Sequence, residues 1–166
     1  MKKAFTLVEL LIVMAIIGVL AALAVGSFRT AQMRGRDAQR KSDLKQIANS
    51  LELFYGDYGK YPDSLGGEIA ACPYNPALST GTSCTWGSSE FTDGKTVYFK
   101  ILSIDPTSPT TEYVYELVNS SNQKYRLFAR LENPKDQNII SGLVVSCGSG
   151  KTCNFAVTSA NTSVDE

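Results

Sequence analysis

Residues 5–28 read FTLVELLIVMAIIGVLAALAVGSF, a run of 24 residues in which Glu9 is the single charged side chain. A helix rises about 1.5 Å per residue, so this run is long enough to cross the roughly 30 Å hydrocarbon core of a bilayer. The apolar region of an ordinary secretory signal peptide is shorter, about 7–15 residues, and ends at a small-residue cleavage site. The small residues Ala21, Ala22 and Ala24 keep that alternative open. The run nevertheless favours a membrane-embedded helix over residues 5–28.

Glu9 is the most informative residue of this run, because a carboxylate in a membrane helix is costly, about 2.5–3.5 kcal/mol at the helix centre. Two interpretations account for it. An acid in the first turn of a helix is favoured by the helix macrodipole. Alternatively, Glu9 pairs with a cation. Residues 5–28 contain no Lys or Arg, so that cation would be an N-terminal amine created by cleavage, on the same chain or on a neighbouring copy.

The chain begins MKKAFTLVE, with two lysines ahead of the apolar run. This stretch resembles the type III signal of type IV pilins and type II secretion pseudopilins. The resemblance implies that a prepilin peptidase/methyltransferase removes a leader of residues 1–4 by cutting between Ala4 and Phe5. It further implies that Phe5 becomes the N-methylated N-terminus and that Glu9 acts in assembly. The family usually has Gly before the cut, where this chain has Ala4.

The predicted helix continues as an amphipathic half, residues 29–61, because no proline interrupts the chain before Pro62. Apolar residues recur there at the period of one helix face. This face consists of Leu44, Ile47, Ala48, Leu51, Phe54, Tyr55 and Tyr58. The sequence Gly59-Lys60-Tyr61-Pro62 predicts that the helix ends near Tyr58. The longer stretch FYGDYGKYP, residues 54–62, resembles the helix-end motif of pilins and major pseudopilins.

Charge is unevenly distributed along the chain. Residues 29–45 hold six Lys/Arg against two Asp, and the chain from residue 46 onward holds eight Lys/Arg against thirteen Asp/Glu. A basic block directly after an apolar run indicates a membrane or filament contact, whereas a nucleic-acid binder usually shows a broader basic surface. The charges at residues 36–43 suit helix-spaced pairs and pairs with neighbouring subunits, or else a solvated helical connector.

Four cysteines, Cys72, Cys84, Cys147 and Cys153, all lie beyond the apolar run. Their spacings do not match close-paired zinc ligands, so two disulfides are favoured. Four cysteines allow three pairings, of which local pairing is the simplest. Disulfides indicate an oxidising compartment outside the cytoplasm. Positive-inside counting of the basic block would place the head in the cytoplasm instead. We follow the cysteines, because the basic block can serve a purpose other than topology.

The remaining chain, residues 62–166, predicts a disulfide-bonded head. Residues 63–95 are rich in Gly, Ser, Thr and Pro and predict a long surface loop. Strands are predicted at 97–102, 112–118, 124–131, 139–145 and, more weakly, 154–158. The fold class is therefore α+β, with a long N-terminal helix packed against a small antiparallel β-sheet head. This arrangement is the pilin fold that the resemblance implies.

A calcium site is an alternative to the expected absence of cofactors. The sequence Ser103-Ile104-Asp105-Pro106, followed by YVY, resembles a stretch of major pseudopilins, some of which bind calcium in a later acidic loop. The matching later segment, residues 134–138, holds one acid. Asp105 and Asp136 would supply few of the six to eight oxygen ligands that calcium takes.

An enzyme is disfavoured, since the chain contains no histidine and we find no Gly-rich phosphate loop or nucleophile motif. The resemblance implies a structural subunit of a type IV pilus-like filament that polymerises through its N-terminal helix after leader cleavage and N-methylation. The alternatives are a major pseudopilin of a type II secretion system and a membrane-anchored extracytoplasmic binding module. The module would need neither Glu9 nor so short a leader.

The same resemblance implies partners and a location. The expected partners are further copies in a helical homopolymer, the prepilin peptidase/methyltransferase, the membrane before assembly and an inner-membrane assembly platform, with no nucleic acid. The precursor would be a single-pass protein of the inner, cytoplasmic membrane. The assembled form would be an extracytoplasmic filament at the cell surface.

Overall fold

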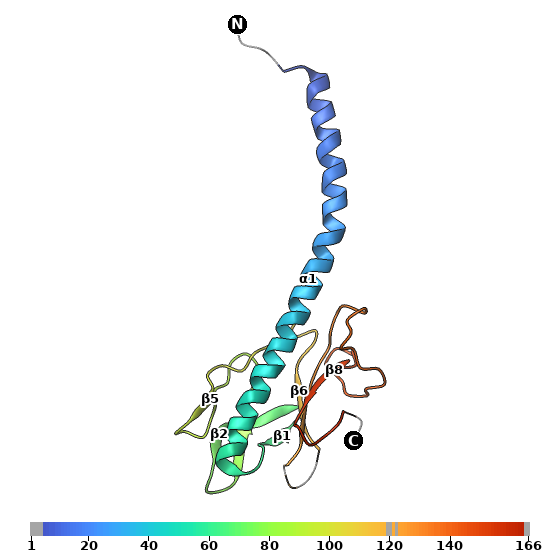
Figure 1. Cartoon of the computed structure of the whole chain (residues 1–166). Helices are drawn as coiled ribbons and strands as arrows, with labels where there is room; N and C mark the ends of the chain where they lie inside the picture. The colour runs from blue at the N-terminus through green and yellow to red at the C-terminus, as the bar shows by residue number, and fades with distance from the viewer. Residues whose placement is uncertain (1–4, 119–120, 122, 165–166) are drawn as a thin grey trace.

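The computed structural model describes residues 5–118, 121 and 123–164, without the side chains of residues 23–27. One helix, α1 (Leu7–Tyr58), is 52 residues long. Its first half stands clear of the rest of the chain, and its second half lies against a head built from short strands (Figure 1).

The strands of the head form three small antiparallel sheets, with the orders β1-β2-β3, β4-β5 and β6-β7-β8. The strands that the structure describes are β1 (Asp63–Leu65), β2 (Glu68–Asn75), β3 (Thr80–Ser83), β4 (Phe91–Thr92), β5 (Val97–Phe99), β6 (Val114–Leu117), β7 (Tyr125–Ala129) and β8 (Phe155–Thr158). The predicted α+β class, a long N-terminal helix on a small antiparallel head, is confirmed.

The second half of α1 supplies one wall of the main core, as its apolar period predicts. Leu44, Ile47, Leu51 and Phe54 are completely buried, and they pack with residues of all three sheets. The helix ends where predicted. Gly59 follows Tyr58 in the left-handed conformation at φ 67°, and its N–H donates to the carbonyl of Tyr55 at 2.7 Å. Glycine adopts this conformation at little cost, so it terminates the helix.

The strands predicted at 112–118 and 124–131 form a hairpin, β6 and β7, with Tyr115 opposite Leu127; its loop lies partly outside the described residues. The alternation of the two strands turns one face to the helix. On that face lie Tyr113, Tyr115, Tyr125, Leu127, Ala129 and Leu131, all at most 2% exposed. Phe128, on the opposite face of β7, packs instead in a second cluster with Cys147 and Cys153. The hairpin is thus buried on both sides.

Two predictions about the head are wrong. Residues 63–95 are not a surface loop, because β1 to β4 lie there and Ile69 and Phe91 are completely buried. The strands were not predicted because they are short and the segment is rich in Gly, Pro and Thr, a composition typical of loops. Residues 139–145 form no strand, although their composition is apolar. Gly142 takes φ 88°, which interrupts an extended run, and β8 pairs with β7 instead.

Candidate functional site

The helix begins with reciprocal hydrogen bonds between Thr6 and Glu9. The Thr6 hydroxyl oxygen accepts from the N–H of Glu9 at 3.3 Å. The Glu9 carboxylate accepts from the N–H and the hydroxyl of Thr6 at 2.9 and 2.7 Å. This capping box satisfies backbone groups that the first turn of a helix otherwise leaves without partners. Glu9 therefore acts as a helix-start acid in the single chain, while its pairing with a cation of another copy stays a prediction.

The predicted processing site lies just before this cap. Phe5 precedes the first helical residue and is 81% exposed. Ala4 and the rest of the leader lie outside the described residues. The described part of the chain therefore does not shield the position at which the leader is predicted to be cut.

The first half of α1 is apolar and exposed around its whole circumference. Its large side chains are 47% to 80% exposed. They include Leu7, Leu10, Leu11, Val13, Ile16, Ile17 and Leu20. Contiguous apolar surface of this kind marks a site of protein or membrane interaction. No helix among the described residues reaches both the length and the apolarity of a membrane span.

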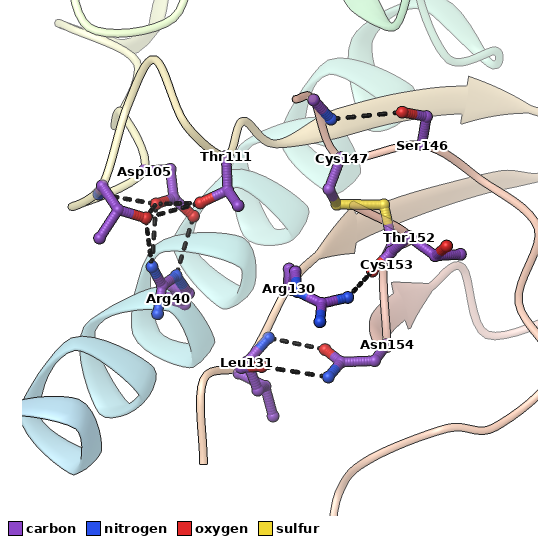
Figure 2. Close-up of a disulfide and its surroundings, with 12 residues drawn as sticks. Arg40, Asp105, Thr111, Arg130, Leu131, Ser146, Cys147, Thr152, Cys153 and Asn154 are labelled. Carbon is purple, nitrogen blue, oxygen red and sulfur yellow. Dashed lines mark hydrogen bonds and ion pairs between the residues drawn. A yellow bond between two sulfur atoms is a disulfide. The ribbon is translucent and has the colours of Figure 1, made fainter. Parts of the chain in front are cut away.

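A buried ionic cluster fixes the helix to the head where the exposed half ends. We call it the Arg40 clamp, and it consists of Asp37, Arg40, Asp105, Thr107, Thr111 and Glu132. The Arg40 side chain is completely buried and donates hydrogen bonds of 2.7–3.0 Å to three carboxylates and the Thr107 hydroxyl. Figure 2 shows Arg40 beside Asp105 and Thr111, which come from a loop of the head. One helical residue thus holds two separate loops.

The carboxylates of the clamp have hydrogen-bond donors in addition to Arg40. The Asp37 carboxylate also accepts from the backbone N–H groups of Glu132 and Asn133, each at 2.8 Å. Burial by itself would lower the pKa of Arg40, but its hydrogen bonds to Asp105 and Glu132 outweigh burial and raise that pKa. Hydrogen bonds from Arg36 and Arg40 lower the pKa of Glu132 to about 2. Arg40 and Glu132 are therefore both charged at neutral pH.

Further pairs on the same stretch of helix correct the prediction for residues 36–43. Arg36 donates to Glu132 at 2.7 and 2.5 Å. Lys41 donates to Asp136 at 2.6 Å, and Tyr113 donates to Asp43 at 2.8 Å. These charges pair with the head of their own chain, so this stretch is not a solvated connector. The only exposed arginines of the described helix are Arg29 and Arg34, which lie before the clamp.

The cysteines lie in two disulfides, Cys72–Cys84 and Cys147–Cys153, the two local pairs. Cys72 lies in β2 and Cys84 directly follows β3, so the first disulfide links neighbouring strands. The second closes a turn beside which the Asn154 side chain accepts from the backbone N–H of Leu131 and donates to its carbonyl, while Arg130 donates to the carbonyl of Thr152 (Figure 2). Both disulfides therefore fasten loops to the sheets of the head.

The two acids considered for calcium already have cationic partners. Asp105 accepts from Arg40, and Asp136 accepts from Lys41. Hydrogen bonding to Lys41 lowers the pKa of Asp136. The described residues hold no group of three or more His, Cys, Asp or Glu side chains arranged for a metal ion.

Sequence reasoning missed the clamp as a unit. Asp37 and Arg40 are spaced for a helical pair, and that local signal was available. Nothing in the pattern points to Asp105 or Glu132, which lie 65 and 92 residues from Arg40 along the chain. Thr107 and Thr111 carry no signal either, since both sit in a polar turn.

A capped helix with an exposed apolar half, clamped to a disulfide-bonded antiparallel head, is a pilin-like arrangement. Comparison with known proteins agrees, because residues 1–25 match the prokaryotic N-terminal methylation motif. The resemblance to type IV pilins and type II secretion pseudopilins is thereby confirmed, and the relatives below carry both names.

The chain is 38% identical over 72 residues to the type IV major pilin protein PilA of Myxococcus xanthus, covering 43% of this chain and 32% of the relative. It is 29% identical over 113 residues to the type II secretion system core protein G of Pseudomonas aeruginosa, covering 68% of this chain and 73% of the relative. It is 27% identical over 133 residues to the fimbrial protein EcpC of Eikenella corrodens, covering 75% and 87%. The chain thus spans about a third of the Myxococcus pilin and more of the other two. No solved structure matches the chain.

Proposed function

We propose that the chain is a structural subunit of a type IV pilus-like filament, which polymerises through its N-terminal helix after leader cleavage and N-methylation. One observation carries this proposal. The apolar half of α1 lies largely within residues 1–25, which match an N-terminal methylation motif, and it stands clear of the described head (Figure 1). Surface of this kind needs a partner, and copies of the same helix offer the same apolar surface. The proposed role is structural, with no catalysis.

Burial gives assembly its driving force. Moving a Leu, Ile or Val side chain from water into an apolar contact contributes about 1.5–3 kcal/mol. The described side chains in the exposed half of α1 include ten exposed Leu, Ile and Val residues. Before assembly the same surface would lie in the inner membrane, with the head outside the cytoplasm, where disulfides persist. An assembly platform in that membrane would then transfer the helix from lipid to the growing filament.

Glu9 would set the register of the bundle. Apolar packing is non-directional, so it does not fix the stagger between neighbouring helices. A buried charge without a partner is strongly disfavoured. The proposed partner of Glu9 is the amine created at Phe5 of an adjacent copy. This ion pair would form at only one axial offset between neighbouring helices.

Intact-mass analysis of the mature protein tests this function. The expected product begins at Phe5 and carries one added methyl group, and electron microscopy of sheared surface fractions shows filaments. A mature protein that starts after Ala22 or Ala24 would instead indicate a secretory signal peptide and an untethered domain. In that case the filament proposal is wrong.

A major pseudopilin of a type II secretion system is the second candidate. Its support is the match to core protein G, which extends over 113 residues and 73% of that relative. Deletion of the chain distinguishes the two. Loss of surface filaments with intact protein secretion supports a pilus, whereas a secretion defect in cells that show no surface filaments supports a pseudopilus.

A further inference from the structure

The head and the helix each carry a charge that the described part of the chain leaves unpaired. Arg29 lies on the same helix face as Arg36, Arg40, Leu44 and Ile47, because their spacings from it are 7, 11, 15 and 18 residues. That face is the one turned toward the head. Arg29 lies about 16 Å before Arg40 along the helix axis, however, in the first half of α1, which stands clear of the head (Figure 1). It is exposed and makes no ion pair with a described residue.

Glu112 is the matching anion. Among the carboxylates of the described residues, its side chain alone makes no hydrogen bond or ion pair. Glu112 lines two hollows of about 280 and 70 Å³. Glu68, Trp86 and Tyr113 line both hollows as well, so the two form one cleft, which we call the Glu112 cleft. No Lys or Arg lines it.

Trp86 gives the cleft an aromatic wall. Its side chain is 8% exposed, and its indole N–H donates to no described residue but remains accessible to solvent. An indole ring also attracts a guanidinium laid against its face, by about 0.5–2 kcal/mol. Two carboxylates beside an aromatic ring, with no cation among them, form a receptor for an arginine side chain.

We infer that the Glu112 cleft of one subunit receives Arg29 of a second copy. The two groups lie on different parts of the chain, so the contact is heterologous. Heterologous contacts that do not close into a ring generate open helical filaments. The charge distribution agrees, since the chain has no net charge while residues 29–45 carry an excess of four positive charges and the chain from residue 46 an excess of five negative charges. This inference rests on the proposed filament function.

Charge reversal tests the contact in the full chain. Glu112→Lys and Arg29→Glu should each lower the amount of filament in sheared surface fractions about tenfold, the effect of losing about 1.4 kcal/mol per added subunit. The double variant Glu112→Lys/Arg29→Glu restores the ion pair in reverse and should recover filaments. Non-reduced mapping of the two disulfides shows that each variant has folded.

Arg34→Glu is the matched control. Arg34 is an exposed arginine five residues further along, about 140° around the helix from Arg29. The Arg34→Glu variant should assemble normally, and combining it with Glu112→Lys should not restore filaments. A second readout uses Arg29→Lys filaments treated with a carbodiimide, which should join the introduced amine to Glu112 or Glu68 of another copy.

Three results would overturn the inference while leaving the filament function standing. One is normal filament yield from both single reversals. Another is a double variant no better than the single ones. A third is loss of Arg29→Glu from the membrane fraction before assembly, which would show that Arg29 faces a lipid headgroup instead. If the unaltered chain forms no filaments at all, the proposed function fails, and this inference fails with it.

Discussion

Arg40 and Asp105 form a fully buried, two-point ion pair, with Nε to Oδ2 at 2.8 Å and Nη2 to Oδ1 at 3.0 Å. Parallel hydrogen bonds from a guanidinium to a carboxylate fix direction as well as distance. The pair therefore sets the angle at which the helix leaves the head. Removing one member of such a pair leaves the other charge buried without compensation.

We predict that Arg40→Met lowers the free energy of unfolding of the head by about 3–5 kcal/mol. The reason is that three carboxylates would lose their shared donor. Urea unfolding followed by tyrosine fluorescence in detergent measures it. Arg34→Met serves as control and should change the free energy of unfolding by less than about 0.5 kcal/mol, since Arg34 is exposed. Equal effects from the two variants would show that the clamp adds no stability.

Stability should also fall in acid through Glu132. Its pKa drops from an ordinary value of 4.5 to about 2 in the folded chain. A carboxylate whose pKa is lowered by folding stabilises the fold fully at pH values above its ordinary pKa. This contribution is lost as the pH falls through the pKa of the folded chain. The loss should therefore occur between pH 4.5 and about 2. Glu132→Gln should flatten the pH dependence of the free energy of unfolding in that window, and an unchanged slope would assign the acid sensitivity to other groups.

Glu9 has a capping role and a proposed assembly role, and one set of variants separates them. Glu9→Gln keeps the capping box, because glutamine at the same position can accept from Thr6, but removes the charge. Thr6→Ala removes the cap and keeps the charge, at a cost of about 1 kcal/mol in helix stability. We predict that Glu9→Gln inserts and folds but forms few filaments, as does Glu9→Ala, while Thr6→Ala assembles. Counts of filaments by electron microscopy decide this. Abundant filaments from Glu9→Gln would show that Glu9 acts only as a capping acid at the start of the helix.

The two disulfides should contribute unequally. Cys72 and Cys84 are 12 residues apart, whereas Cys147 and Cys153 are 6 apart. Each doubling of a closed loop adds about 0.6 kcal/mol of chain entropy. Replacing both members of the first pair with alanine should therefore destabilise the head by slightly more than the same change in the second, each within about 2–5 kcal/mol. Thermal unfolding compares them, and peptide mapping without reduction should recover the two local pairs only.

Local pattern predicted the parts of this fold in which neighbouring residues decide the outcome. The stripe from Leu44 to Phe54 follows from helical period, and the end of α1 follows from Gly59. The strands predicted at 112–118 and 124–131 are the two that pair as the hairpin. In each case the signal lies within one element, so a single sequence contains it.

The remainder depends on contacts between distant residues. A two-residue strand such as β4 is stabilised by its neighbours rather than by its own sequence. Arg40 looks like any surface arginine until Asp105 and Glu132 are brought to it from two loops. The apolar composition of residues 139–145 suggested a strand, but the backbone at Gly142 decided against it.

The grip of the head on α1 extends from the Arg36 pair to Phe54, along roughly 27 Å of a helix about 78 Å long. Its ion pairs and apolar contacts follow one another along the helix axis. A pull on the head parallel to that axis would therefore load all of them at once, in shear, instead of peeling them apart in sequence. Contacts loaded in shear share a force among them, so we expect the head of this chain to pass tension to the helix without peeling away from it.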